Sequence, residues 1–181
     1  MPAHEAGGAI RLETERLTLA NWEPDDWPAF HAIASHPEVM RYIATGAPWP
    51  EQQSRGFVER QMALYVAREF CLWKLTPREG GPLIGFCGLQ PLPETPEIEI
   101  GWWLARAYWG RGLATEAARA ALHDGFTRVG LTRIVAIAQP ANTASIRIMQ
   151  KLRMQYEGMR EARGIPIVFY AVEQAAPNRE R

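Results

Sequence analysis

Apolar residues recur along the chain with two periods, and each period predicts one type of secondary structure. Spacings of three or four positions place apolar side chains on one face of an α-helix. In the segment 114–129, for example, Ala118, Ala121, Leu122 and Phe126 share one face. The predicted helices cover residues 25–35, 52–68, 114–129 and 143–152.

Shorter apolar runs that end at glycine or proline predict strands. The predicted strands cover residues 16–20, 70–75, 83–89, 98–104 and 133–139, with final strands around Gln155 and at 167–172. The middle three runs are typical of an antiparallel meander. The order strand, helix, strand over residues 98–139 requires a right-handed crossover, so those two strands should run parallel. The pattern predicts one α+β domain over residues 10–173, with flexible ends at 1–9 and 174–181.

Size and charge narrow the class of partners. The chain has 181 residues, long enough for one well-buried core. Its 20 Lys and Arg residues equal its 20 Asp and Glu residues, so no overall positive field attracts nucleic acid or anionic lipid. No apolar run reaches about 18 residues and no leader precedes the domain, so we expect a cytoplasmic protein with no membrane partner.

Cysteine and histidine point to no special chemistry. Cys71 and Cys87 flank a turn signal at 79–82 and could face each other across a hairpin. Cytosolic thiols stay reduced, so we expect two buried, unpaired cysteines. His31 and His36 lack the partner spacing of a metal site, so no metal is expected.

A glycine-bearing helix start follows the strand 98–104 and is the candidate for phosphate binding. The residues that lead into this helix are Gly110, Arg111, Gly112, Leu113 and Ala114. The first turn of a helix has unpaired N–H groups and the positive end of the helix dipole, and glycines let a phosphate approach the backbone.

Spacing separates the known phosphate loops. A Walker-type loop needs Gly, four residues, then Gly-Lys-Ser/Thr, and no glycine here begins that string. A dinucleotide loop needs a small residue where this chain has Thr115, and an acidic residue at the tip of the next strand, where residues 139–142 have none. A plain helix entry remains the alternative for this fragment.

The residues around the two glycines resemble motif A of the GNAT acyl-CoA N-acyltransferases. That motif, Gln/Arg-x-x-Gly-x-Gly/Ala, binds the coenzyme A pyrophosphate through backbone amides. Here Trp109 takes the first place, Gly112 is the required glycine and Ala114 is the final small residue. Tryptophan in the first place is similar to the branch of ribosomal-protein N-acetyltransferases, where Trp-Gly-x-Gly-x-Ala-Thr-Glu-Ala is common.

Three other segments resemble that branch, in the right order. They are residues 12–19 (its first strand), 37–43 (its second helical segment), and Asn142 with Ser145, Lys151 and Leu152 (its motif B). The resemblance spans about residues 10–173, so the chain is identified as a member of this family.

The resemblance implies the GNAT fold. This fold is a mixed, mostly antiparallel, twisted sheet of about six to seven strands with helices on both faces, and its central parallel strand pair splays at the coenzyme site. The cosubstrate would be acetyl-CoA, whose pantetheine arm would hydrogen-bond the backbone of Trp102, Trp103 and Leu104. The implied pyrophosphate loop is formed by Trp109, Gly110, Arg111, Gly112, Leu113, Ala114 and Thr115, and Asn142, Ser145 and Lys151 are further expected contacts. Members of this branch often pair, so a homodimer is an open possibility.

The implied reaction is direct transfer of acetyl to a primary amine, either a protein N-terminus or a small amine. The tyrosine that many family members use as general acid, seven residues after the asparagine, would fall on Met149. Ser145 therefore becomes the candidate donor to the departing sulfur. The simpler alternatives are that Ser145 supports a helix start and that Asn142 is a helix N-cap.

Acidic residues at the start of the strand 98–104 are candidates for the general base. Glu97 and Glu99 alternate with isoleucines, so both should point to one face. Glu99 lies closer to the expected cleft and is the preferred base, whereas Glu97 fits a solvated strand face. Glu116 fits best as a charge that offsets the helix dipole.

Two departures from the family pattern leave other outcomes open. Met149 in place of the tyrosine, with an unproven base, leaves room for a noncatalytic acyl-CoA-binding sensor or regulatory module. Arg153 stands where the family has glycine after the second helix. It should either take a left-handed conformation, at about 1 kcal/mol, or the helix should end differently.

Overall fold

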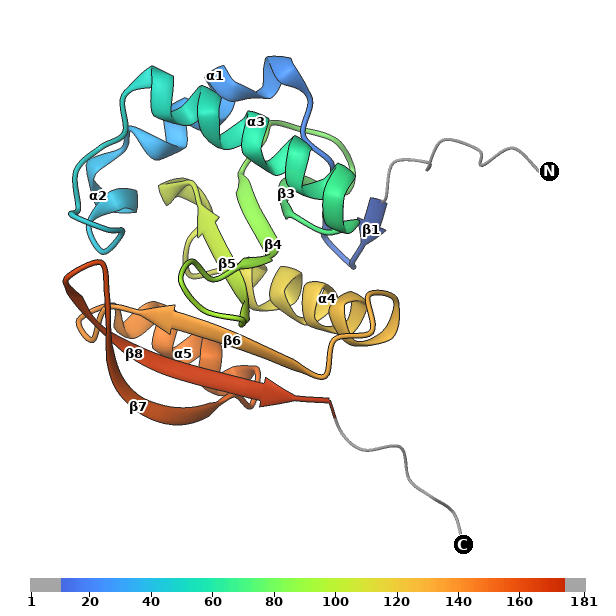
Figure 1. Cartoon of the computed structure of the whole chain (residues 1–181). Helices are drawn as coiled ribbons and strands as arrows, with labels where there is room; N and C mark the ends of the chain where they lie inside the picture. The colour runs from blue at the N-terminus through green and yellow to red at the C-terminus, as the bar shows by residue number, and fades with distance from the viewer. Residues whose placement is uncertain (1–10, 175–181) are drawn as a thin grey trace, which may run out of the picture.

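An eight-stranded mixed sheet runs through the middle of the molecule (Figure 1). The computed structural model describes residues 11–174. In sheet order the strands are β1 (Arg11–Glu13), β2 (Leu17–Ala20), β3 (Leu72–Pro77), β4 (Gly85–Pro91), β5 (Ile98–Leu104), β6 (Arg133–Ala138), β8 (Ile165–Glu173) and β7 (Gln155–Ala162). All neighbouring strands are antiparallel except β5 and β6, which are parallel.

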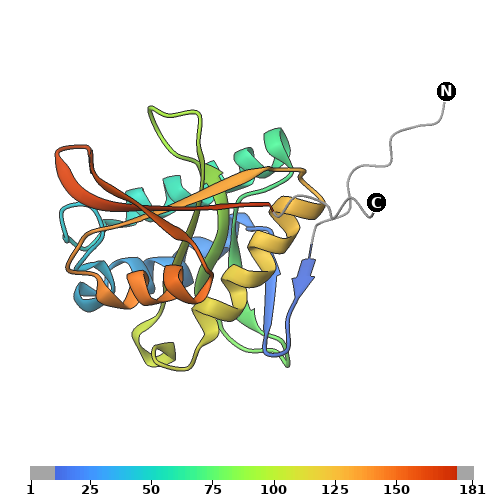
Figure 2. The same ribbon diagram turned by 90° about the horizontal axis from the view of Figure 1, so that it is seen from below.

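Helices cover both faces of the sheet. They are η1 (Pro24–Asp26), α1 (Trp27–Ala34), α2 (Pro37–Met40), α3 (Glu51–Arg68), η2 (Arg106–Tyr108), α4 (Leu113–Thr127) and α5 (Thr143–Lys151). On one face, Phe30 of α1 and Phe57 of α3 contact Phe86 of β4. On the other face, Gly125 of α4 lies against Leu89 of β4. α5 packs beside α4, as Figure 2 shows.

The packing of α4 fixes where its N-terminus lies. Ala117, Ala118 and Ala121 are completely buried, and these small side chains let the helix lie close to the sheet. At Gly125 even a methyl group would come within 2.7 Å of the Leu89 Cδ1 atom. Larger side chains would push α4 away from β4 and β5, and would displace the loop that precedes it.

The predicted α+β class, the mostly antiparallel sheet and the parallel pair around a helical crossover are confirmed. The sheet has eight strands rather than the expected six to seven, because residues 12–19 form two short strands instead of one. A tight turn separates them. The Thr14 backbone N–H donates to the Leu17 carbonyl (2.9 Å), and the Leu17 N–H donates to the Thr14 Oγ1 atom (2.9 Å).

Local expectations about Arg153 and the cysteines are also met. Arg153 has φ 59°, so it takes the left-handed conformation that glycine takes in the family. The Met154 N–H then donates to the Met149 carbonyl (3.0 Å), which closes the end of α5. Cys71 and Cys87 are buried and unpaired, and burial raises the pKa of both thiols.

The predicted chain ends lie mostly beyond the described part of the chain. Residues 1–10 and 175–181 fall outside it. Gln174, the first residue of the expected flexible end, donates its backbone N–H to the Thr132 carbonyl (2.9 Å). Over residues 11–174, no helix combines the length and apolar character needed to cross a membrane.

Candidate active site

The loop between β5 and α4 has the geometry of an anion-binding turn. The Trp109 indole N–H donates to the Leu104 carbonyl (2.8 Å), which holds the loop against the end of β5. Gly110 and Gly112 have φ 72° and 76°, a region that L side chains rarely adopt. A Cβ atom at Gly110 would meet nothing within 4 Å, so backbone conformation, and not crowding, is what requires glycine there. The surface above the loop is therefore open to a ligand.

The N-terminus of α4 supplies donors to that open surface. Gly112 is the N-cap residue, and no side chain of the described residues caps the helix. The first helical hydrogen bond runs from the Glu116 N–H to the Gly112 carbonyl (3.1 Å). The amides of Leu113, Ala114 and Thr115 therefore have no partner within the helix. With the helix dipole, they form a site that fits a phosphate group.

Sequence reasoning missed two residues that hold the start of α4 in place, Thr14 and Arg16. Both lie in the turn between β1 and β2 and contact the Glu116 carboxylate in the first turn of α4. Partial burial opposes ionisation of Glu116, but the hydrogen bonds from Thr14 and Arg16 outweigh it and lower its pKa. The matched segment 12–19 contains both residues, but a pattern along the chain does not show which distant group they contact.

The parallel strands beside the loop separate after one pair. In the described chain, β5 and β6 share a single registered pair, Glu99 with Val135. Farther along β5, Trp102, Trp103 and Leu104 pair with β4 on one side only. Among the described residues their other edge has no strand partner, so it is available to an extended ligand. The loop before α4 and the turn before α5 both follow the carboxyl ends of these strands, where ligands bind in open α/β sheets.

Glu99 is a buried carboxyl beside this separation. Its residue is 9% exposed, and it lies on the same sheet face as Trp103. The Gln90 Nε2 atom, on the facing residue of β4, donates to the Glu99 Oε1 atom (2.6 Å). Burial raises the pKa of Glu99 to about 7, although the Gln90 hydrogen bond and the charge of Arg163 both lower it. The carboxyl can therefore exchange a proton near neutral pH.

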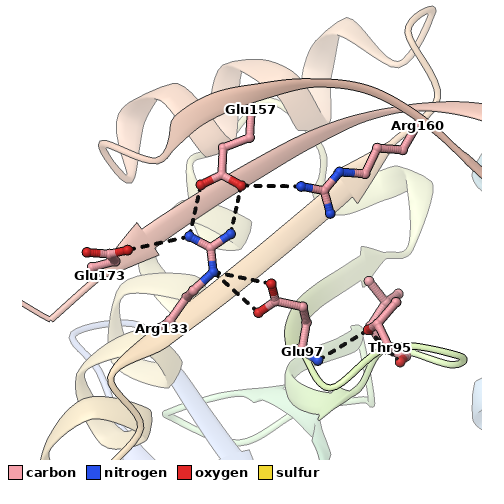
Figure 3. A network of polar contacts seen from close by, with 7 residues as sticks. Thr95, Glu97, Arg133, Glu157, Arg160 and Glu173 are labelled. Carbon is pink, nitrogen blue, oxygen red and sulfur yellow. Dashed lines mark hydrogen bonds and ion pairs between the residues drawn. The ribbon is translucent and has the colours of Figure 1, made fainter.

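Glu97 has a different environment, shown in Figure 3. Both of its carboxylate oxygens lie 3.3 Å from the Arg133 Nε atom. Arg133 also makes a bidentate pair with Glu157 (2.8 and 2.7 Å), and Arg160 lies 3.4 Å from the same carboxylate. Glu97 is thus half-buried in an ion-pair network on the β6–β8–β7 side, rather than on the solvated strand face expected from the sequence.

The start of α5 combines a cap with a hydroxyl group. The Ser145 N–H donates to the Asn142 Oδ1 atom (3.2 Å), so the predicted N-cap is confirmed. Ser145 is partly exposed in the first turn. Met149, at the position of the family's tyrosine, is 1% exposed and belongs to the core.

The remaining predicted residues are more scattered. Lys151 is exposed at the last position of α5, about 14 Å along the helix axis from Asn142. Arg111 is exposed, and its guanidinium lies 5.5 Å from the centre of the Tyr108 ring. The loop, the free β5 edge and the start of α5 thus lie at the carboxyl ends of the parallel strands, Glu99 lies at the registered β5–β6 pair, and Lys151 lies at the far end of its helix.

The two surface hollows are not part of this site, and the described residues include no metal-binding group. One hollow of about 470 Å³ is bordered by Trp27, Arg55 and Met62, and another of about 270 Å³ by Arg133 and Glu157. Neither is lined by a predicted site residue. Within residues 11–174, no group of three His, Cys, Asp or Glu side chains could hold a metal ion.

Comparison with known proteins agrees with the geometry. The family profile described as "Acetyltransferase (GNAT) domain" matches residues 16–155. The uncharacterized N-acetyltransferase p20 of Bacillus licheniformis is 34% identical over 149 residues, which cover 82% of this chain and 84% of that protein.

Solved structures show the same arrangement. A GNAT-family acetyltransferase from Bacillus anthracis superposes with a TM-score of 0.77 at 31% identity, and the match covers 91% of this chain and 98% of that one. The ribosomal L7/L12 alpha-N-protein acetyltransferase RimL, in complex with coenzyme A, has a TM-score of 0.77 at 16% identity, with 91% and 98% covered. At that identity the second likeness shows the shared fold.

Proposed function

Because the chain belongs to the GNAT family of acetyltransferases, we propose that it transfers acetyl from acetyl-CoA to a primary amine by direct attack within a ternary complex. One observation carries the proposal: an uncapped helix N-terminus, opened by two positive-φ glycines, lies at the carboxyl end of a strand that separates from its parallel neighbour. That combination offers a phosphate site and an extended backbone edge to one ligand.

The coenzyme would use both features. The amides of Leu113, Ala114 and Thr115 would bind its pyrophosphate. The free edge of β5 at Trp102 and Trp103 would pair with the amides of the pantetheine arm, as an added strand does. When bound, acetyl-CoA supplies the thioester carbon that the amine attacks.

Glu99 is the proposed general base. An amine must lose a proton as its C–N bond forms, and a carboxyl with a pKa of about 7 is largely ionised at pH values slightly above neutral. The burial that raises this pKa also strengthens the attraction between the carboxylate and a substrate ammonium. Gln90 holds the carboxyl in one orientation through its 2.6 Å hydrogen bond.

Ser145 is the proposed donor to the leaving group. As the C–S bond breaks, the sulfur gains negative charge, and the Ser145 hydroxyl can donate a hydrogen bond or a proton to it. The capped first turn of α5 fixes this residue at the edge of the sheet where β6 ends.

A noncatalytic acyl-CoA-binding module is the second candidate. Met149 favours it, because methionine stands where the family has its usual tyrosine and has no acidic proton to donate. Such a module would keep the loop and the β5 edge but would need neither Glu99 nor Ser145.

A thiol-release assay tests the two candidates together. The protein is supplied with acetyl-CoA and a panel of N-terminal peptides, polyamines, amino acids and aminoglycosides, and calorimetry measures acetyl-CoA binding in parallel. We expect binding, and turnover with one amine class that is lost in Glu99→Gln. Binding without any turnover would support the sensor, and no binding would refute the coenzyme site.

A further inference from the structure

The turn between β1 and β2 is fastened to the start of α4, and this contact has a consequence for coenzyme binding. We propose that Arg16 is a positioning residue that holds the glycine loop and cancels the charge of Glu116, which would otherwise repel the coenzyme phosphates. The inference rests on the coenzyme site proposed above.

The contacts between this turn and α4 converge on the Glu116 carboxylate. The Glu116 Oε1 atom accepts from the Thr14 hydroxyl (2.6 Å) and from the Arg16 backbone N–H (2.8 Å). The Oε2 atom accepts from the Arg16 Nε atom (2.7 Å), with the Nη2 atom 2.6 Å away. About 100 residues separate Glu116 from this turn, so the contact joins the edge of the sheet to the helix that opens the site.

The same guanidinium also reaches the loop. The Arg16 Nη1 atom donates to the Arg111 carbonyl (2.9 Å), and Arg111 lies between the two positive-φ glycines. The Nη2 atom lies 3.7 Å from the position of a Cβ on Gly112. Arg16 therefore holds the peptide between Arg111 and Gly112, in the part of the loop that the two glycines make adaptable.

Charge explains why the pair matters beyond packing. A carboxylate in the first helical turn occupies the place where the helix dipole favours an anion, so it competes with a bound phosphate. Glu116 is ionised, since its hydrogen bonds lower its pKa. The Arg16 guanidinium neutralises that charge and leaves the free amides of Leu113 and Ala114 for the ligand.

Arg78 offers a matched control. Its Nη1 atom donates to the Thr14 carbonyl (3.1 Å), and its Nη2 atom lies 3.7 Å from Glu13, so it binds the same turn. It contacts neither Glu116 nor the loop in any of these interactions. Loss of Arg78 should therefore disturb the turn without removing the charge partner of Glu116.

The test compares Arg16→Ala, Glu116→Gln, their double variant and Arg78→Ala. Calorimetry with coenzyme A should show about a tenfold or greater loss of affinity for Arg16→Ala, since the Glu116 carboxylate then has no cation to neutralise it beside the phosphates. The double variant should bind more tightly than Arg16→Ala, because it also removes that carboxylate. Arg78→Ala should bind as the wild-type protein does. A double variant no better than Arg16→Ala would overturn the charge argument.

Donor kinetics separate a local effect from general damage. S-acetylpantetheine lacks the pyrophosphate, so Arg16→Ala should lower kcat/KM with acetyl-CoA and leave kcat/KM with S-acetylpantetheine near the wild-type value. An equal loss with both donors would show a merely structural role and overturn the proposal. If the wild-type protein binds no coenzyme A, the coenzyme site itself is wrong, whereas normal wild-type binding with an unaffected Arg16→Ala refutes this inference alone.

Discussion

Replacement of Glu99 by glutamine tests the proposed base through two independent properties. Glutamine has nearly the shape of the protonated carboxyl, and its Oε1 atom can still accept the hydrogen bond from Gln90. The variant therefore removes ionisation at this position while the packing between β4 and β6 is kept.

The stability effect follows from the raised pKa of Glu99. Burial raises this pKa from 4.5 to about 7, so the folded protein holds the proton more tightly than the unfolded chain does. The contribution of Glu99 to stability is then fully present below about pH 4.5 and is lost as the pH rises through about 7. Between about pH 5.5 and pH 8.5 the wild-type protein should lose about 2 kcal/mol of unfolding free energy relative to Glu99→Gln.

Urea unfolding of both proteins at the two pH values measures that loss, and kinetics measure the role in turnover. With the proposed base, kcat/KM of the wild-type protein should fall about tenfold for each pH unit below about 7, and Glu99→Gln should be about 100 to 10,000 times slower. Glu97→Gln removes a nearby carboxylate held by Arg133 and should retain near wild-type turnover. A flat wild-type profile through neutral pH, or an active Glu99→Gln, would refute the role of Glu99 as base.

Four other substitutions test separate parts of the site and fold. Ser145→Ala should lower kcat about 10- to 100-fold while calorimetry shows unchanged coenzyme A affinity, and a wild-type kcat would rule out the serine as donor. Gly112→Ala and Gly130→Ala, at φ 76° and 78°, should each cost about 1 kcal/mol in urea unfolding, but only Gly112→Ala should weaken coenzyme A binding. Arg153→Gly should raise the unfolding free energy by about 1 kcal/mol, because glycine takes φ 59° without strain, and a decrease would show that contacts of the arginine side chain outweigh that strain.

The sequence predicts those parts of the fold that depend on local pattern. The alternation around Ile98 and Ile100 gave β5 its observed bounds, and the order of elements gave the parallel crossover to β6. Asn142 before an amphipathic segment was enough to predict the cap of α5. Residues 11–20 were not predicted as two strands because the turn between them, at residues 14–16, has no glycine or proline to mark it.

The parts of the site that were not predictable depend on contacts between distant segments. The environment of Glu99 is set by Gln90 across the sheet and by burial, and the two glutamates of this segment have the same local pattern but different surroundings. Arg16 and Glu116 are each unremarkable as exposed charges in sequence. Only the folded chain shows that they meet at the phosphate loop.

The single registered pair between β5 and β6 divides the sheet into two antiparallel blocks, β1–β5 and β6–β8–β7. α4 packs mainly on β4 and β5 and also contacts β6, so it adds a second connection between the two blocks. Two blocks that share a single registered strand pair tend to unfold as separate cooperative units. Native-state hydrogen exchange would then show two classes of protected amides. A ligand that contacts both blocks adds binding free energy only when both are folded. It should therefore merge the two classes of protected amides into one. Bound acetyl-CoA would then hold the two blocks together as well as react. The resistance of the protein to proteolysis would rise with the acetyl-CoA concentration around it.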